Sequence, residues 1–211
     1  MKKYRFVDRR SDPARLPRRI ARRLLANRRT VSAVSDGARF FVNDQRAPAL
    51  APLRFGKYPF SYNGCEVAAA YNAFLELGLD ADLADLAAEF ELNGLVGFVL
   101  FGKFSPFAGK WGADPRKLPR LFSAYGVGFR KIDGSPALRA AVESPAPGKR
   151  VFIASFLNRG FLLGGVHTFC FTVSDGVIRA RNGYAPSPAC FDSLAPNAKL
   201  FTAFELFTGN A

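Results

Sequence analysis

The sequence predicts an α+β domain in which helices come first and an antiparallel sheet follows. Helical periodicity dominates before residue 145, whereas short apolar segments and a tight turn dominate after it. Together these observations predict a folded domain over residues 31–211, with a helical lobe at about 55–145 and a sheet lobe at about 150–211. Residues 1–30 are predicted to form a basic N-terminal extension.

The predicted extension carries most of the net charge. Of the formal net charge of +13, residues 1–30 contribute 12 − 2 = +10 and residues 31–211 contribute 18 − 15 = +3. Apolar residues repeat at helical spacing over residues 14–25 with arginines around them, which predicts an amphipathic helix. The sequence leaves open whether this helix packs on the domain or contacts an acidic surface, a membrane interface or a polyanion.

Four helices are predicted for the helical lobe, over residues 65–77, 82–92, 115–125 and 137–143. Gly78 is a natural terminator for the first of them, and Asp82 is a suitable N-cap for the second. The segment between Gly94 and Gly112 is rich in glycine and phenylalanine and follows neither period for long. It is predicted to be a large loop, which either lines a cleft or anchors itself in the core.

Strands are predicted over residues 151–156, 166–173, 177–181 and 200–206, with a further short strand at 39–43. The sequence Ser174-Asp175-Gly176 predicts a hairpin turn, because Asp-Gly tolerates the positive φ that such turns require. Counting outward from this turn brings the strand end at His167 close to Asn182.

Several classes of protein are disfavoured by composition and motifs. Three cysteines at unrelated spacings do not suggest a disulfide framework, although a Cys170–Cys190 bridge remains open. The chain has no Cys/His cluster for zinc, no P-loop and no GxGxxG fingerprint, so we expect no metal and no cofactor. No signal peptide is evident and no apolar run reaches the roughly 20 residues of a membrane span, so the expected location is the cytoplasm.

Three residues have the order and the spacing of a cysteine nucleophile site. Cys65 begins the predicted helix at 65–77, and a helix N-terminus together with a neighbouring imidazolium lowers a thiol pKa. His167, the only histidine of the chain, begins a strand and is the only imidazole available as a base. The amide oxygen of Asn182 is expected to orient its ring. Gly64 is expected to relieve the backbone before the helix and to let a substrate carbonyl approach.

These segments resemble papain-like cysteine peptidases, and within them the compact bacterial branch typified by bacteriocin-leader-processing (double-glycine) peptidases. The resemblance covers roughly residues 55–207 and rests on YNGCEVAAAYNAFLELG, on GADP followed by a helix and Tyr-Gly, and on GGVHTFCFTVSDGVIRARNGY. It implies a papain-like two-lobe fold in which Cys65 is the nucleophile, His167 the base and Asn182 the orienting residue.

Two positions depart from the pattern of that family. Glu66 follows the cysteine where the family usually has glycine, and Pro59 replaces a glutamine that contributes to the oxyanion hole. Asn63 and the backbone N–H of Cys65 are the expected replacement donors. Glu66 is expected to oppose thiolate formation unless it faces away or pairs with a base.

The sequence therefore predicts a cysteine peptidase-like hydrolase that acts on peptide or isopeptide bonds through a thioester. The expected partner is a peptide or protein substrate, with a further contact between residues 1–30 and an acidic surface or polyanion. Two alternatives remain, namely a papain-fold acyl or amide transferase that uses the same thioester, and a papain-like binding module without catalysis. The departures at Pro59 and Glu66 favour the second alternative.

Overall fold

The structure, a computed structural model, describes residues 3–7, 12–36, 38–96, 112–158, 165–185, 188–196 and 198–209. Within these ranges the helices are α1 (Arg18–Ser35), α2 (Phe60–Asn63), α3 (Cys65–Glu76), α4 (Leu83–Leu92), α5 (Leu118–Ala124), α6 (Ser135–Glu143) and α7 (Phe191–Leu194). The strands are β1 (Arg54–Phe55), β2 (Tyr58–Pro59), β3 (Val127–Ile132), β4 (Arg150–Leu157), β5 (Val166–Ser174), β6 (Val177–Arg181) and β7 (Lys199–Thr208).

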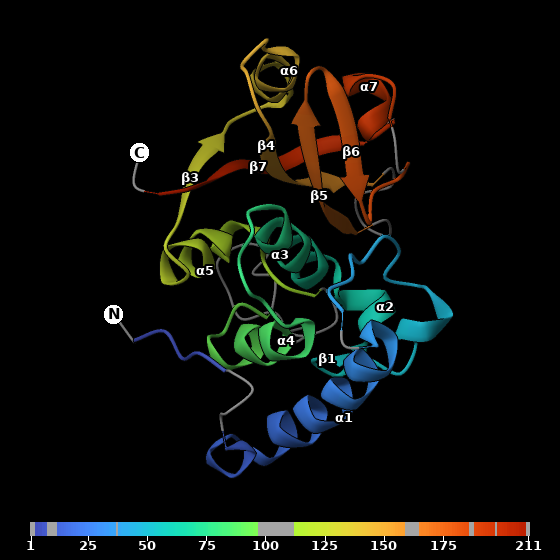
Figure 1. Ribbon diagram of the computed structural model, residues 1–211, viewed down its shortest axis with the longest axis vertical. Helices are drawn as coiled ribbons and strands as arrows, with labels where there is room; N and C mark the ends of the chain where they lie inside the picture. The colour runs from blue at the N-terminus through green and yellow to red at the C-terminus, as the bar shows by residue number, and fades with distance from the viewer. Residues whose placement is uncertain are drawn as a thin grey trace.

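The main sheet is antiparallel with strand order β3-β7-β4-β5-β6, and β1 and β2 form a separate small hairpin. Helix α3 lies between this sheet and the other helices of the first half of the chain, whereas α6 and α7 lie at the far end (Figure 1). The mixed α+β class with an antiparallel sheet is therefore as predicted.

Strand alternation divides the apolar residues of the sheet between two core clusters. On β5, Cys170 belongs to the cluster that also contains α3 and α4, whereas Phe169 and Phe171 belong to the cluster beneath α6 and α7. Helix α3 is buried from Cys65 to Phe74, and its alanines at 68–70 are completely buried. Small side chains here allow the helix axis to approach the sheet closely, so the start of α3 has a fixed position beside β5.

The strands of the second half confirm the sequence prediction to within about two residues. The Asp-Gly turn between β5 and β6 also forms as expected, with φ values of 50° at Asp175 and 75° at Gly176. Asp82 caps α4 by accepting hydrogen bonds from the N–H groups of Ala84 and Asp85. Each of these features depends on local chemistry that can be read from neighbouring residues.

Two sequence predictions about strands were wrong. Strand β3 lies inside the predicted helical lobe but pairs with β7, so the sheet draws on residues before 150. Residues 39–43 form no strand, and the side chain of Asn72 makes the backbone hydrogen bonds of Val42 instead. It accepts from the N–H of Val42 at 2.9 Å and donates to the Val42 carbonyl at 2.8 Å. Most of the predicted Phe-rich loop, residues 97–111, lies outside the described residues.

Helix α1 is longer than predicted and packs on the domain. It runs to Ser35 rather than residue 25, so the predicted boundary at residue 30 falls within it. Leu24 and Val31 are buried in the core cluster that contains α4. Arg23 and Arg28 form ion pairs with Glu91 and Asp85 of α4, with Nε–O distances of 2.9 and 2.8 Å. Part of the arginine content of α1 therefore neutralises acidic groups of the same chain.

The segment before α1 is also held against α4. Asn93 accepts a hydrogen bond from the N–H of Arg5 at 2.8 Å and donates to its carbonyl at 2.9 Å. The buried carboxyl of Glu89 accepts from the N–H of Val7 at 2.8 Å and from the hydroxyls of Tyr4 and Tyr125. Burial raises the pKa of Glu89 to about 7. In the described ranges, no helix combines the length and the apolar character that crossing a membrane requires.

Candidate active site

Cys65 lies at the first position of α3, next to the part of β5 that extends beyond the end of β6. Its Sγ is 3.3 Å from Oε2 of Glu66 and 3.8 Å from the backbone carbonyl oxygen of Val166. The residue is buried, with an exposed fraction of 6%. The sulfur is thus enclosed, but by polar groups rather than by an apolar pocket.

Gly64, which precedes the cysteine, is required for a different reason from the predicted one. Its φ of −89° is available to any residue, so the backbone needs no relief. A Cβ at this position would lie 2.4 Å from the ring of Phe60. The space beside Gly64 is therefore occupied by Phe60, and the expected approach of a substrate carbonyl through this space does not fit the structure.

Glu66 faces the thiol and is completely surrounded by protein. Besides the sulfur, its carboxyl oxygens lie 3.4 Å from the N–H of Ala113 and 3.4 Å from the hydroxyl of Thr168. That hydroxyl is also 2.9 Å from Ser155 Oγ. Burial raises the pKa of Glu66 to about 7. The side chain neither faces away nor pairs with a basic residue among these contacts, so its effect on the thiol is the unfavourable one.

The Cys65 thiol is consequently protonated at neutral pH. Burial raises its pKa well above the usual value, and the charge of Glu66 raises it further, against a smaller opposing contribution from the backbone N–H of Thr168. The expectation that the helix start and a neighbouring imidazolium would lower this pKa was wrong, because burial makes the largest contribution and raises it.

The imidazole of His167 is fixed by the backbone of Asn182. Nε2 lies 2.6 Å from the Asn182 carbonyl oxygen. A carbonyl only accepts hydrogen bonds, so Nε2 carries a proton and Nδ1 of the neutral ring has a free lone pair. Burial lowers the pKa of His167, which favours this neutral form. The ring therefore has the tautomer that a general base requires.

The sulfur and the imidazole belong to adjoining parts of the site but are not hydrogen-bonded to each other. Sγ contacts the backbone on both sides of His167, at the Val166 carbonyl and the Thr168 N–H. The ring of His167 shares a sheet face with Phe169, at a centroid distance of 5.7 Å. Among the described contacts, the resting thiol bonds to Glu66 rather than to the ring.

Asn182 orients the ring through its backbone carbonyl. The sequence prediction that its side-chain amide oxygen would do so was wrong. Asn182 adopts a left-handed conformation with φ of 59°, which turns its side chain toward Gln45. The amide oxygen accepts from the Gln45 N–H at 2.9 Å, and the amide nitrogen donates to Gln45 Oε1 at 2.7 Å. Gln45 Nε2 in turn donates to the Ser61 carbonyl at 2.9 Å.

Two further site residues, Gln45 and Tyr184, were not predicted from the sequence. Gln45 is 137 positions from Asn182, and no local pattern indicates that pairing. Continuing the β5–β6 register places Tyr184 opposite His167, and their rings are 5.2 Å apart in an edge-to-face arrangement. The tyrosine hydroxyl donates to Asn158. Extending the hairpin count by two residues would have found this aromatic neighbour.

Asn63, the expected oxyanion donor, precedes the nucleophile by two residues. It is the last residue of α2 and is buried, with an exposed fraction of 4%. A Cβ added to Gly112 would lie 2.9 Å from its carbonyl oxygen, so Gly112 approaches this backbone closely. Its role as an oxyanion donor, together with the N–H of Cys65, stays a prediction.

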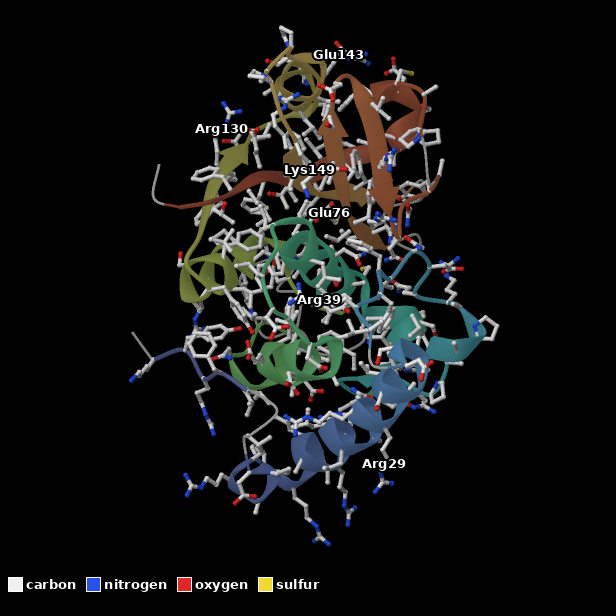
Figure 2. The ribbon with its side chains drawn as sticks, in the orientation of Figure 1. Arg29, Arg39, Glu76, Arg130, Glu143 and Lys149 are labelled. Atoms are coloured by element: carbon white, nitrogen blue, oxygen red, sulfur yellow. The ribbon has the colours of Figure 1, made fainter. Side chains whose placement is uncertain are left out.

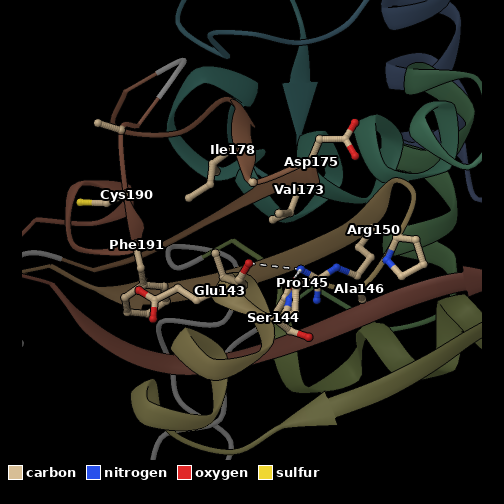
Figure 3. Close-up of a pocket in the computed structure, with 14 residues that line it drawn as sticks. Glu143, Ser144, Pro145, Ala146, Arg150, Val173, Asp175, Ile178, Cys190 and Phe191 are labelled. Carbon is tan, nitrogen blue, oxygen red and sulfur yellow. Dashed lines mark hydrogen bonds between the residues drawn. The ribbon is translucent and has the colours of Figure 1, made fainter.

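The other two cysteines do not form a comparable site. Both are free thiols, so the Cys170–Cys190 bridge is not formed. Exposed Cys190 lines a pocket with Phe191, Ile178 and Arg150 (Figure 3). Hydrogen bonds within the Cys190–Ser193 turn lower the pKa of this thiol. The guanidinium of Arg150 is occupied by backbone carbonyls at the end of α6. This pocket cannot contain an imidazole, because the only histidine lies elsewhere.

In the ranges that the structure describes, no cluster of histidine, cysteine, aspartate and glutamate is arranged to hold a metal ion. Comparisons of the chain with protein families, with curated proteins and with solved structures find no match.

Proposed function

We propose that the protein is a papain-like cysteine hydrolase that cleaves peptide or isopeptide bonds through a thioester on Cys65. One observation carries this proposal. The sulfur at the start of α3 lies against the backbone that flanks the only imidazole, and that imidazole is held by Asn182 as the base-competent tautomer. The order of helices and sheet, with α3 packed beside β5, supports the papain-like arrangement.

The reaction starts from a neutral thiol and a neutral imidazole. For this step the ring of His167, which shares a face of β5 with Phe169, must turn toward the sulfur. Its Nδ1 then removes the thiol proton as Sγ attacks the substrate carbonyl, and the imidazolium protonates the leaving amine. Water, deprotonated by the same nitrogen, hydrolyses the thioester. Asn63 and the N–H of Cys65 are the proposed donors to the oxyanion. Glu66 aids the attack only in its protonated form, in which its O–H donates to the developing thiolate rather than repelling it.

The substrate class follows from this chemistry. A thioester intermediate requires a carbonyl with a leaving group, and a peptide or protein substrate meets this requirement without any cofactor. The transferase alternative uses the same intermediate and differs only in whether an amine or water accepts the acyl group. Three free thiols are consistent with a reducing compartment, so the cytoplasm is the proposed location.

A binding module without catalysis is the second candidate, and one observation favours it. The carboxyl of Glu66 faces the sulfur at 3.3 Å and raises the thiol pKa, which is the reverse of what a resting thiolate nucleophile needs. In that case Cys65→Ala would leave the function intact.

The test is cleavage of a proteome-derived peptide library, with new N-termini identified by mass spectrometry. We expect cleavage by the wild-type protein and none by Cys65→Ala or His167→Gln, whereas Cys190→Ser should cleave normally. Added hydroxylamine or glycine amide separates transfer from hydrolysis, because a transferase gives the amine adduct in preference to the acid. Equal product formation by Cys65→Ala would exclude both enzymatic mechanisms.

A further inference from the structure

The outer face of α1 carries a stripe of arginines, namely Arg18, Arg19, Arg22 and Arg29. All four are exposed, and Figure 2 shows Arg29 extending away from the body of the protein. With 3.6 residues per turn, the four positions fall within about 100° of one another around the helix. At 1.5 Å per residue the stripe is roughly 16 Å long.

The stripe is distinct from the arginines that hold α1 in place. Arg23 and Arg28 point toward α4, where they pair with Glu91 and Asp85. The sequence of α1 contains no aspartate or glutamate, so no acidic neighbour on the helix itself balances the outer arginines. The acidic residues of α4 are thus used on the inner face, and the outer charge is presented to solvent.

The outer arginines are placed where they oppose the stability of the helix. Arg18 and Arg19 are its first two residues, next to the positive end of the helix dipole, and the first turn contains no acidic residue. Arg22 follows Arg18 at a spacing of four, which brings two like charges together. Residues that contradict local preference without a structural gain indicate a functional site.

We propose that this arginine stripe binds the phosphate backbone of double-stranded nucleic acid. Guanidinium groups donate paired hydrogen bonds to phosphate oxygens, and a straight row of them matches a regular row of phosphates. Helix α1 has no aromatic residue, so it offers no stacking platform for single strands. Its one large exposed apolar side chain is Leu25, which gives little to insert into a lipid surface. This activity is additional to the proposed hydrolase and independent of it.

The experiment measures the affinity for a short fluorescent DNA duplex by anisotropy across a series of salt concentrations. The test variant replaces all four stripe arginines by glutamine. The control replaces Arg130, Lys131, Arg179 and Lys199 on the sheet by glutamine and so removes the same charge elsewhere. We expect the stripe variant to reduce the magnitude of the negative slope of log affinity against log salt by about 3 to 4, while the control keeps the wild-type slope.

A thermal melt shows whether the variant folds, and the stripe variant should melt no lower than wild type because it loses unfavourable charges. Equal loss of affinity in both variants would assign the binding to net charge and overturn the proposal. Binding of wild type to vesicles of phosphatidylserine and phosphatidylcholine, without binding to the duplex, would overturn it in favour of a membrane. Peptide cleavage is measured on the same samples, so a failure of one proposal does not affect the other.

Discussion

Gln45 and Asn182, 137 positions apart in the sequence, hold each other by two hydrogen bonds. The backbone N–H of Gln45 donates to Asn182 Oδ1, and Asn182 Nδ2 donates to Gln45 Oε1. Gln45 also donates to the carbonyl of Ser61, shortly before α3 begins. This pair therefore connects the turn that fixes His167 with the segment that leads to Cys65.

Removing the Gln45 side chain should destabilise the protein and misplace the imidazole. Gln45→Ala leaves the buried Asn182 amide without its acceptor, which costs about 1–3 kcal/mol in the free energy of unfolding. Urea denaturation measures this change. Gln45→Met, which keeps the volume, should show the same loss, and full stability in both variants would mean that the pair contributes nothing.

The left-handed backbone of Asn182 can be tested separately from its amide. Asn182→Gly and Asn182→Ala both remove the hydrogen bonds to Gln45, but alanine must also adopt a φ of 59°. We expect Asn182→Ala to be less stable than Asn182→Gly by about 1 kcal/mol. An alanine variant that equals or exceeds the glycine variant would show that the turn relaxes, and the carbonyl contact with His167 would then be lost.

Glu66 should control the ionisation of the nucleophile. Because its charge raises the pKa of Cys65, Glu66→Gln should lower that pKa, although burial will still hold it above the ordinary value. The rate of iodoacetamide labelling is measured between pH 6 and 11 in a Cys190→Ser background. The midpoint of the rate against pH gives the pKa of Cys65. The background is needed because exposed Cys190, whose pKa is lowered, should react faster than Cys65 in the wild-type protein. An unchanged or higher midpoint in Glu66→Gln would contradict the arrangement.

Protein stability should fall as pH rises from about 4.5 to 7. The pKa values of Glu66 and Glu89 are raised from 4.5 to about 7 in the folded state, so the folded state binds protons more tightly than the unfolded state. Their contribution is fully present below pH 4.5 and is lost through pH 7, by about 3 kcal/mol for each group. Urea titrations across this range measure the slope. Glu66→Gln and Glu89→Gln should each flatten it, and exposed Glu143→Gln should not.

Gly64 should not tolerate a side chain. Gly64→Ala places a Cβ 2.4 Å from the ring of Phe60, so the ring or the helix start must move, at about 1–3 kcal/mol. Adding Phe60→Leu should recover part of the loss by making room. Failure of this rescue would point to a backbone requirement at residue 64 instead.

The sequence was most informative where local chemistry decides the structure. Strand β5, the Asp-Gly turn and the cap of α4 followed from side-chain periodicity and turn preferences. The approach of His167 to Asn182 was also deduced, because counting along a hairpin gives positions without coordinates. Strand β3 was missed because its sequence, VGFRKI, alternates weakly and its partner β7 lies far along the chain.

The details of the site could not be deduced in the same way. The ring of His167 is held by the backbone carbonyl of Asn182 and not by its side-chain amide, because Asn182 has a positive φ and its amide bonds to Gln45, which is distant in the sequence. Whether Glu66 faces the sulfur depends on how α3 meets β5 at Thr168. The length of α1 was underestimated because its second half has few apolar residues, and acidic residues of α4 hold it in place through tertiary contacts.

Acylation of Cys65 by p-nitrophenyl acetate is the most direct test of the claim that His167 activates this sulfur, because so small a donor needs no substrate recognition. The rate of acetyl transfer to Cys65, located by peptide mapping in a Cys190→Ser background at pH 7.5, is compared with that of His167→Gln. We expect a loss of about 100-fold or more when the imidazole is removed. Equal acetylation with and without His167, in folded proteins, would contradict it.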